Sequence, residues 1–372
     1  MSKEHMAKRL RAIRRDLNKK KIGCLIITKP ANVTYATGFL GDDSWAIVAK
    51  GRVYLLTDSR YTEQAEKECP SCTIIDRAGP MAEAVAKLLK ERKSVRTVTV
   101  EESTPLGDFE RLRRTVKVRL RVAADVIESV RSIKDTSEIA AIRTAASISS
   151  QALEQTLPYI KPGVSESELA GMLDFQIRKF GARNSFETIV AFGPNASRPH
   201  HQPGKRKLGK KDSVLIDFGA RFKGYCSDIT RCFAIGGMTS LYKRVYDVVE
   251  QAQAAAIKMI KAGVKITQVD AAARKVIDKS GLPVYGHGTG HGLGLEIHES
   301  PFLKADAKGT LKAGQVITIE PGIYMPGKLG VRIEDDILVT ETGYKILTRS
   351  CPHSPYGRRT SRFCSIWLEN AM

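Results

Sequence analysis

The chain contains 372 residues, enough for two domains that each bury a core of their own. With 42% hydrophobic and 27% charged residues it has a globular composition, and no uninterrupted apolar run approaches the ~18 residues of a membrane span. The basic N-terminus is not followed by the apolar segment of a signal peptide. We therefore expect a soluble, cytoplasmic protein with no membrane partner.

The formal charge of +20 raises the alternative of a nucleic-acid-binding protein. The basic residues are, however, spread along the chain, with local clusters at residues 8–21, 111–121 and 205–211. The chain contains neither an RNA-binding signature nor the Cys/His spacing of a zinc finger. We interpret the basic residues as solvated faces and do not expect nucleic acid as a partner.

The seven cysteines are odd in number and irregularly spaced, which argues against a disulfide framework. Cys69 and Cys72 form a CxxC motif. No second pair completes a zinc site, and no thioredoxin-like context surrounds them. We expect neither a metal nor a redox function at this motif.

Strands and helices alternate over about the first 125 residues, which is typical of a small α/β domain. Leu10, Ile13 and Leu17 recur at helical spacing amid charged residues, so residues 8–21 are expected to form an amphipathic helix. Two β-branched runs around a Lys-Gly turn predict a hairpin. The expected elements are helices at residues 61–68 and 81–92 and strands at residues 24–28, 45–49, 53–57 and 97–100.

A boundary is expected near residue 130, which gives a first domain of residues 1–130 and a second of residues 131–350. Asp135 and Glu138 have the spacing of a capping box, and a long apolar-periodic helix follows them. Helices mixed with antiparallel hairpins make the second domain α+β. Its further elements are helices at residues 165–180, 242–262 and 267–279 and strands at residues 214–219, 225–233, 316–324 and 330–339.

The stretch YGHGTGHGLGLEIHES at residues 285–300 interleaves His287, His291 and His298 with five glycines. So many glycines disfavour a helix or strand, and they are tolerated where the backbone passes close to another group. Neutral imidazole is the commonest metal ligand and a general acid or base near neutral pH. The stretch therefore predicts a functional site, whose metal-binding carboxylates would have to come from elsewhere.

Two predicted hairpins supply carboxylates. If the first is centred between Phe222 and Lys223, Asp217 lies directly opposite Asp228. Opposed residues have Cβ atoms only ~5 Å apart, so the like charges need a cation between them.

The second hairpin repeats this geometry. Centred on Gly327, it places Glu320 opposite Glu334. The four carboxylates carry four negative charges, which two divalent ions would neutralise, and His291 adds a neutral ligand. Oxygen ligation with imidazole suits Mn²⁺, Co²⁺, Fe²⁺ or Zn²⁺. Two such ions ~3.5 Å apart activate water and polarise a carbonyl or phosphoryl oxygen.

The motifs PHH, DFG, SDITR, HGTGHGLGLEIHE, IEPGIY and VRIED occur in this order between about residues 195 and 340. In these motifs the second domain resembles the pita-bread metallopeptidases of family M24, a group that includes methionine aminopeptidase, aminopeptidase P, prolidase and creatinase. The first domain resembles the N-terminal domain of the aminopeptidase P, prolidase and creatinase branch, through Asn32–Phe39 and Leu56–Tyr61. The resemblance reaches about residue 348 and implies an α/β domain followed by a pita-bread α+β catalytic domain.

Site roles follow from the resemblance by matching motif. It implies that His200 lies near the substrate, that His298 stabilises the tetrahedral intermediate, and that Glu320 is the general base. His287 and Arg332 match substrate-site positions of the branch that cleaves Xaa-Pro bonds. The implied ligands of two divalent ions, Mn²⁺ foremost, are Asp217, Asp228, His291, Glu320 and Glu334.

Within the family, the resemblance favours cleavage of the bond between an N-terminal residue and a following proline. Creatinase lacks the metal-binding acids, and methionine aminopeptidase usually lacks both the N-terminal domain and a histidine at the position of His287. An Xaa-Pro bond is a tertiary amide, which defeats peptidases that need an N–H. The motifs do not separate an Xaa-Pro dipeptidase from an Xaa-Pro aminopeptidase.

The resemblance also implies a homodimer, and it leaves one alternative of another class. Some pita-bread relatives have lost the metal and bind proteins or nucleic acids instead, and the charge of +20 is compatible with that reading. The complete ligand set argues against it. Residues 351–372 do not resemble the family's usual ending, and we expect a tail without a catalytic role.

Overall fold

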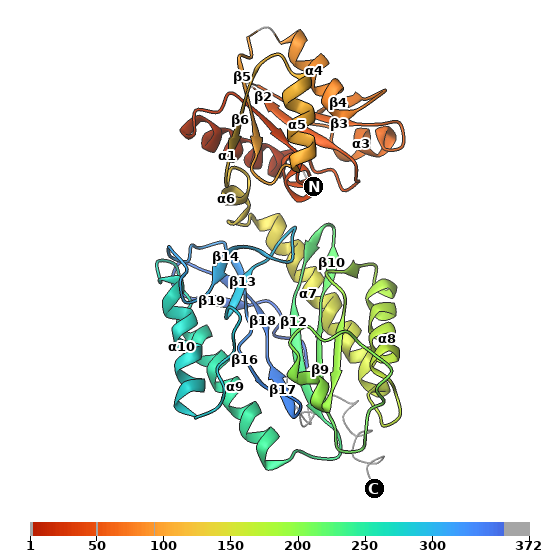
Figure 1. Cartoon of the computed structure of the whole chain (residues 1–372), viewed down its shortest axis with the longest axis vertical. Coiled ribbons are helices and arrows are strands. Elements are labelled where there is room, and N and C mark those ends of the chain that lie inside the picture. Colours follow the sequence, from red (N-terminus) through yellow and green to blue (C-terminus); the bar gives the residue numbers. More distant parts are fainter. Residues whose placement is uncertain (1–2, 50, 93, 353–372) are drawn as a thin grey trace. The chain divides into compact units, whose positions relative to one another are not determined.

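The computed structural model describes residues 3–49, 51–92 and 94–352. The chain divides into two compact units between Arg131 and Ser132 (Figure 1). The helices of the first unit are α1 (Lys3–Lys19), α2 (Pro30–Thr37), α3 (Thr62–Glu68), α4 (Met81–Glu91), α5 (Leu106–Thr115) and α6 (Glu128–Arg131). Its strands are β1 (Cys24–Ile27), β2 (Trp45–Ala49), β3 (Arg52–Thr57), β4 (Thr73–Asp76), β5 (Thr97–Glu101) and β6 (Arg119–Ala123).

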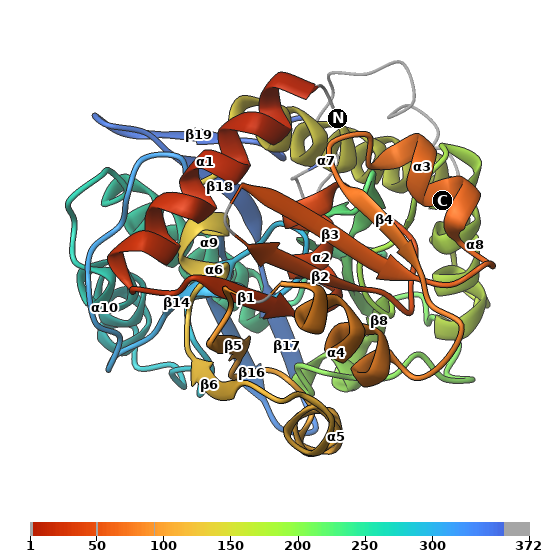
Figure 2. The same cartoon turned by 90° about the horizontal axis from the view of Figure 1, so that it is seen from above.

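The six strands of the first unit form one sheet in the order β4-β3-β2-β1-β5-β6. The β1–β2 and β2–β3 pairs are antiparallel, and the remaining pairs are parallel. Helices α4 and α5 lie together against this sheet (Figures 1 and 2), where Val85, Leu88 and Leu112 pack on alternate strand residues. The predicted α/β class of the first domain is confirmed, although α2 was not among the expected helices. A proline at its start fixes φ without costing a helical hydrogen bond.

The second unit begins with α7 (Thr136–Thr156), and its other elements follow in chain order. Its helices are completed by α8 (Glu166–Lys179), α9 (Ser240–Lys258), α10 (Ile266–Lys279) and the short 3₁₀ turns η1 (Leu157–Tyr159) and η2 (Gly193–Ser197). Its strands are β7 (Arg183–Asn184), β8 (Ile189–Phe192), β9 (Ser213–Phe218), β10 (Ala220–Phe222), β11 (Tyr225–Cys226), β12 (Ile229–Ala234), β13 (Gly290–Gly292), β14 (Glu299–Leu303), β15 (Val316–Ile319), β16 (Gly322–Met325), β17 (Leu329–Arg332), β18 (Asp335–Val339) and β19 (Tyr344–Ile346).

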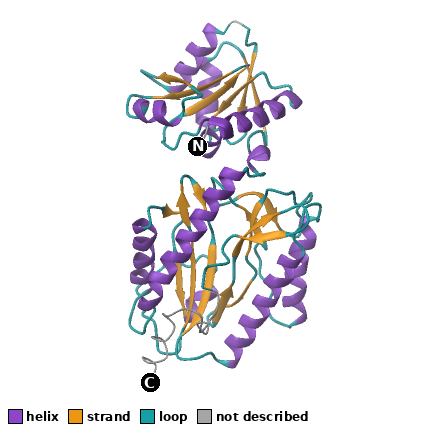
Figure 3. Ribbon diagram, turned by 180° about the vertical axis from the view of Figure 1, so that it is seen from behind, coloured by secondary structure: helices purple, strands orange, loops and turns teal. Residues whose placement is uncertain are grey.

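The strands of the second unit lie between two helix pairs (Figures 1 and 3). Apolar residues of α7 and α8 pack on β8, β9 and β12, while those of α9 and α10 pack on β15 to β18. The sheets that the two pairs cover run β12-β9-β8 and β14-β13-β15-β18-β19, with antiparallel neighbours throughout. The α+β prediction for this domain is therefore confirmed.

Helix α7 begins with the predicted capping box. Asp135 Oδ1 accepts the backbone N–H groups of Ser137 (2.8 Å) and Glu138 (2.9 Å), and Glu138 Oε2 accepts the Asp135 N–H (3.0 Å). These bonds satisfy N–H groups that have no partner within the helix.

Replacing Asp135 by Ala should lower the free energy of unfolding by about 1 kcal/mol, because the cap is lost. The urea midpoint of the purified protein measures this change. Asp135→Asn, which can still cap, is the matched control. Equal losses in both variants would show that the cap contributes nothing.

The first acid-bearing hairpin has a register different from the predicted one. Phe222 pairs with Tyr225, so the turn is centred between Lys223 and Gly224, where both residues have positive φ (49° and 86°). Two positive φ angles define the type I′ turn that suits a twisted hairpin, and glycine at its second central position permits it. Asp217 therefore faces Thr230 rather than Asp228.

The second acid-bearing hairpin has the predicted register. Ile319 pairs with Asp335 on one side and Gly322 with Arg332 on the other, which centres the hairpin on Gly327 as expected. The long strands predicted here are nevertheless interrupted, at residues 320–321 and 333–334, and the predicted strand 225–233 is interrupted at residues 227–228.

Two further predictions concern the cysteines and the C-terminal tail. Cys69 is buried and Cys72 half-buried, and both are free thiols. Cys351 and Pro352, which were assigned to the tail, contact the second unit: Cys351 lies in its core, and Arg231 Nε donates to Pro352 O (2.9 Å). The remaining tail, residues 353–372, lies outside the described residues. Within the described part of the chain, every helix is too short or too polar to cross a membrane.

Candidate metal centre and active site

Strand β13 carries the glycine-rich segment between two neighbouring strands. It pairs with β14 on one side and β15 on the other, with a bulge between His291 and Gly292. A Cβ atom at Gly290 would lie 1.9 Å from the Thr318 carbonyl oxygen, and one at Gly292 would lie 2.4 Å from the Ser300 oxygen. Only glycine fits so close to other backbone, so the close approach inferred from the sequence is confirmed.

His291 is held with one ring nitrogen free to bind a cation. Its Nδ1 lies 3.0 Å from the Gly292 carbonyl oxygen, which can only accept, so Nδ1 carries the hydrogen. The Nε2 atom lies 3.4 Å from Glu320 Oε1 and 3.6 Å from Asp228 Oδ2. Burial lowers the pKa of His291 to about 4, so the imidazole is neutral and its Nε2 lone pair is available near pH 7.

The four candidate carboxylates come from the two hairpins. Asp217 lies within β9, whereas Asp228, Glu320 and Glu334 lie at the interruptions of the other strands. One ligand atom each from Asp228, His291 and Glu334 lie within 4.8 Å of one another, close enough to share an ion. Asp217 is a diagonal neighbour of Asp228 across the hairpin, so both face the same side despite the shifted register.

Without a cation these acids repel one another. The pKa values of Asp228 and Glu334 are raised well above their ordinary range, first by burial and then by the neighbouring carboxylates. Burial likewise raises the pKa of Glu320 to about 7. Asp217 Oδ1 and Asp228 Oδ1 are buried with no hydrogen-bond partner. Buried, unpartnered carboxylate oxygens are expected where a cation belongs.

A directed hydrogen-bond chain links His287 to the carboxylates. The Nδ1–H of His287 donates to Gly288 O (2.7 Å), so its Nε2 accepts from the hydroxyl of Tyr324 (3.1 Å). Arg332 Nη1 donates to the Tyr324 oxygen (2.9 Å), and Arg332 Nη2 donates to Asp217 Oδ2 (2.5 Å). The two predicted substrate-site residues, His287 and Arg332, are thus joined through a tyrosine.

All nine predicted site residues line a single pocket of about 490 Å³. His200 and His298 are its exposed histidines, and the ring of His298 lies edge-on to that of His291, with centroids 4.5 Å apart. The nine are His200, Asp217, Asp228, His287, His291, His298, Glu320, Arg332 and Glu334. This pocket contains donors for a cation, groups that can move a proton, and an opening to solvent.

The comparisons with known proteins agree with this arrangement. The model of "Metallopeptidase family M24" matches residues 140–341, and that of the "Creatinase/Prolidase N-terminal domain" matches residues 9–133. The uncharacterized peptidase YqhT of Bacillus subtilis (strain 168) is 39% identical over 329 residues, which cover 88% of this chain and 93% of that protein. The chain belongs to metallopeptidase family M24.

Solved structures similar to this M24 chain carry both domains. A Xaa-Pro dipeptidase from Bacillus anthracis has a TM-score of 0.90 and 36% identity, with coverage of 94% of this chain and 99% of that chain. An X-Pro aminopeptidase from Thermotoga maritima MSB8 has a TM-score of 0.84 and 35% identity, with coverage of 90% and 97%. A prolidase from Pyrococcus horikoshii OT3 has a TM-score of 0.85 and 31% identity, with coverage of 92% and 98%. The creatinase-type N-terminal domain and the pita-bread fold are therefore confirmed.

The residues of this M24 chain fit the divalent ions that a metallopeptidase family implies. The candidate donors are carboxylate oxygens and one neutral imidazole nitrogen, a set that suits first-row divalent ions. The two unpartnered oxygens and the mutually raised pKa values are what a cation would relieve. Asp228, His291 and Glu334 form the tightest group, and Glu320 and Asp217 border it.

Three residues of the M24 site were not indicated by the sequence. Tyr324 ends the IEPGIY motif and joins His287 to Arg332. The hydroxyl of Thr230 donates to Glu334 Oε2 (2.7 Å), and Thr230 Oγ1 accepts from Arg332 Nε (3.0 Å). The only signal for Tyr324 and Thr230 was a polar group within an apolar strand, which must find a partner but does not reveal which partner it finds.

Glu166 is the third such residue. It is fully buried at the start of α8, and its two carboxylate oxygens take hydrogen bonds from the Phe192 N–H (2.8 Å), Asn195 Nδ2 (2.8 Å), His201 Nε2 (2.8 Å) and the Gly204 N–H (3.1 Å). These donors come from the loop that contains His200. Glu166 therefore fixes that loop, and nothing beyond an acid beside the helix cap marked it in the sequence.

Proposed function

We propose that this protein is a dinuclear metal-dependent peptidase that cleaves the bond between an N-terminal residue and a following proline. The observation that carries this proposal is the convergence of Asp228, His291 and Glu334 with the proton-accepting Glu320 in one pocket. Solved relatives described as a Xaa-Pro dipeptidase, an X-Pro aminopeptidase and a prolidase support the choice of substrate.

The proposed ligands are Asp217, Asp228, His291, Glu320 and Glu334. Divalent ions bound there would lower the pKa of water and polarise the scissile carbonyl. Mn²⁺ is the first expectation, and Co²⁺, Zn²⁺ or Fe²⁺ would suit the same donors.

Glu320 is the proposed general base. Its carboxylate lines the pocket, and Oε1 lies 3.4 Å from Nε2 of the proposed ligand His291, so it borders the position where the attacking water would be activated. Glu320 would take a proton from the attacking water and pass it to the proline nitrogen. That nitrogen needs a proton to leave because it becomes a secondary amine.

The histidines at the pocket mouth and wall have separate proposed roles. Burial lowers the pKa of His298, so a neutral imidazole faces the pocket and can donate one N–H to the developing oxyanion. His200 lies at the pocket mouth, where it can contact the substrate. His287 would form the wall of the proline site, held in one tautomer by the chain to Tyr324 and Arg332.

Two predictions stay with this proposal. A homodimer is expected from the family, and light scattering tests it. A cytoplasmic location is expected from the sequence, and fractionation of the source cells tests it.

A substrate panel tests the proposed function. With added Mn²⁺, Co²⁺ or Zn²⁺ the purified protein should release the N-terminal residue from Xaa-Pro peptides, and it should leave Met-Ala peptides intact. Dipeptides such as Gly-Pro and tripeptides of the form Xaa-Pro-Yaa distinguish the dipeptidase from the aminopeptidase. Cleavage of Met-Ala alone would contradict the proline preference. A metal-free, inactive protein that binds nucleic acid at 200 mM salt, where charge contacts alone are weak, would instead favour a binding protein.

A further inference from the structure

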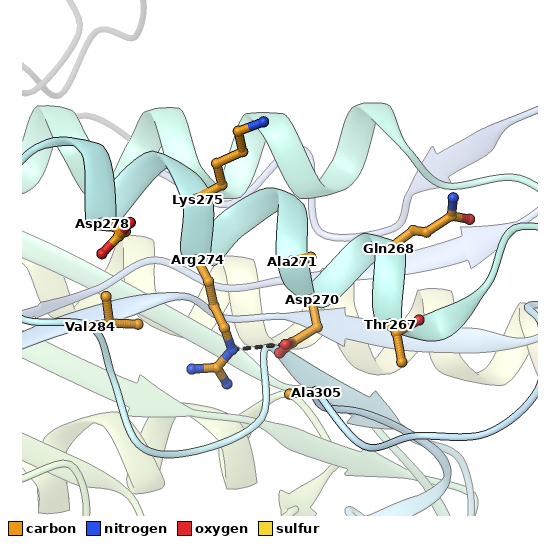
Figure 4. A pocket seen from close by; sticks show the side chains of 9 residues that line it. All are labelled: Thr267, Gln268, Asp270, Ala271, Arg274, Lys275, Asp278, Val284 and Ala305. Atoms are coloured by element: carbon orange, nitrogen blue, oxygen red, sulfur yellow. Dashed lines mark hydrogen bonds and ion pairs between the residues drawn. The ribbon is translucent and has the colours of Figure 1, made fainter.

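Two residues of α10 lie outside the active-site pocket and have no role in the proposed chemistry. Asp270 and Arg274 are one helical turn apart and line a separate surface pocket (Figure 4). Arg274 Nε donates to Asp270 Oδ2 (2.8 Å), the ion pair drawn in Figure 4. The Asp270 side chain is 1% exposed and that of Arg274 is 25% exposed. A buried carboxylate paired in this way is costly to leave without its partner.

Arg274 uses its remaining donors on backbone of the histidine-rich segment. Its Nη1 donates to the Tyr285 carbonyl oxygen (2.8 Å) and its Nη2 to the His287 carbonyl oxygen (2.5 Å). The guanidinium also lies over the Tyr285 ring, with Cζ 4.4 Å from the centroid. These contacts hold the backbone at His287 and two residues before it, around the flexible Gly286.

Asp270 holds the same segment after His287. The Thr289 hydroxyl donates to Asp270 Oδ1 (2.7 Å), and Thr289 Oγ1 lies 2.5 Å from the Tyr285 hydroxyl. The pair thus fixes residues 285–289 on both sides of His287. Charge-assisted hydrogen bonds of this kind are roughly twice as strong as neutral ones.

The fixed segment touches the active site at two points. The His287 ring accepts from Tyr324, which in turn accepts from Arg332. The Thr289 carbonyl oxygen accepts the backbone N–H of Glu320 (2.8 Å). Arg274 therefore contacts the backbone of His287 directly, and Asp270 is linked through Thr289 to the backbone of Glu320.

We propose that Asp270 and Arg274 are positioning residues, which aim His287 at the substrate proline and fix the backbone of Glu320 without touching the substrate themselves. This inference rests on the proposed function, because it assigns the two residues to the same reaction. Lysine cannot replace Arg274 fully, since its single ammonium lacks the planar fork that reaches three acceptors at once.

The test compares Arg274→Ala, Arg274→Lys and Asp270→Asn with the wild type in the full-length, metal-loaded protein. We expect kcat/KM on an Xaa-Pro peptide to fall roughly 10- to 100-fold in Arg274→Ala, as for other residues that orient site groups. The loss should divide between kcat, through Glu320, and KM, through His287. Arg274→Lys should restore part of it. The matched control is Arg244→Ala, which removes an arginine on α9 that donates to the Ser280 carbonyl oxygen (2.7 Å), away from the site.

Amide hydrogen exchange supplies a readout that needs no activity. Protection of the Glu320 N–H should fall in Arg274→Ala and Asp270→Asn and stay constant in Arg244→Ala. Unchanged exchange at Glu320, or wild-type kcat and KM for the folded fraction of Arg274→Ala, would overturn the inference. If the wild type cleaves no Xaa-Pro peptide, the proposed function fails, and the exchange result still decides whether the pair positions Glu320.

Discussion

Replacing Asp228 by Asn or Glu334 by Gln is expected to abolish both peptidase activity and tight binding of divalent ions. Each residue contributes a ligand atom to the group formed with His291, whose atoms lie within 4.8 Å of one another. Losing one negative ligand weakens ion binding, because the amide that replaces it supplies no charge and the site keeps fewer carboxylates to neutralise the ions. Activity with added Mn²⁺ and metal content after dialysis, measured by elemental analysis, check this expectation.

The matched control for these variants is Asp306→Asn. Asp306 is an exposed acid that pairs with Lys304 at the edge of the pocket (3.3 Å), so the substitution removes the same charge without a candidate ligand. It should retain metal and activity. Asp228→Asn with wild-type metal content would exclude this residue as a ligand. If Asp228→Asn retained the metal but lost activity, Asp228 would act in catalysis and not as a metal ligand.

Removing the metal should make stability fall with rising pH between about pH 6.5 and 8. In the metal-free protein the pKa values of Asp228, Glu334 and Glu320 are raised, the last to about 7. A carboxylate with a raised folded-state pKa binds its proton more tightly in the native state. Its contribution is therefore greatest at low pH and is lost as pH rises through the folded-state value.

The neighbouring histidines have the opposite effect on the pH dependence of stability, and they exert it at lower pH. Burial lowers the pKa values of His287 and His291 to about 4, so folding gains stability as pH rises from 4 to 6.5, and the gain is complete above 6.5. Above that pH these two histidines add no further pH dependence, which leaves the carboxylates whose pKa values are raised. Each carboxylate that is protonated in the native state and ionised in the unfolded state lowers the free energy of unfolding by about 1.4 kcal/mol per pH unit, until the pH exceeds its folded-state pKa.

Urea unfolding in the presence of a chelator measures this slope. The metal-loaded protein should show a much flatter profile over the same range, because bound cations keep the carboxylates ionised in the native state. Glu320→Gln should reduce the slope of the metal-free protein, since it removes the group with a pKa near 7. If the stability of the metal-free protein were constant from pH 6.5 to 8, the pKa values of these carboxylates would not be raised by burial and mutual repulsion.

The candidate site residues named from the sequence lie in one pocket, whereas the strands around them differ from the predicted ones. The second hairpin register followed from Glu320, Glu334 and a central Gly327, because a turn rich in glycine and proline leaves few alternatives. The first register was wrong by one residue at the turn, since the choice depended on Lys223 adopting a positive φ. Asp217 was predicted to face Asp228 but faces Thr230 in the structure. Asp228 and Thr230 are two residues apart and so share a face of the strand, which keeps Asp217 and Asp228 on the same side.

Other parts of the site could not be read from the chain. Glu166 and Thr230 act through partners more than 25 residues away, and no local pattern encodes such pairs. The interruptions at Asp228, Glu320 and Glu334 were also missed, because each acid adjoins an isoleucine and lies within a stretch that favours strand. Tertiary contacts, rather than local preference, decide where those strands stop.

Because of these interruptions, most of the candidate metal-binding acids do not take part in the strand pairing that holds the fold together. Three of the four proposed acidic ligands lie at breaks in the strand ladders, so changing their side chains removes no strand pairing and opens no cavity in the apolar core. Removing one of several crowded negative charges even relieves repulsion. A chain of this kind is expected to remain folded after losing these acids, so its fold can be kept while its function changes.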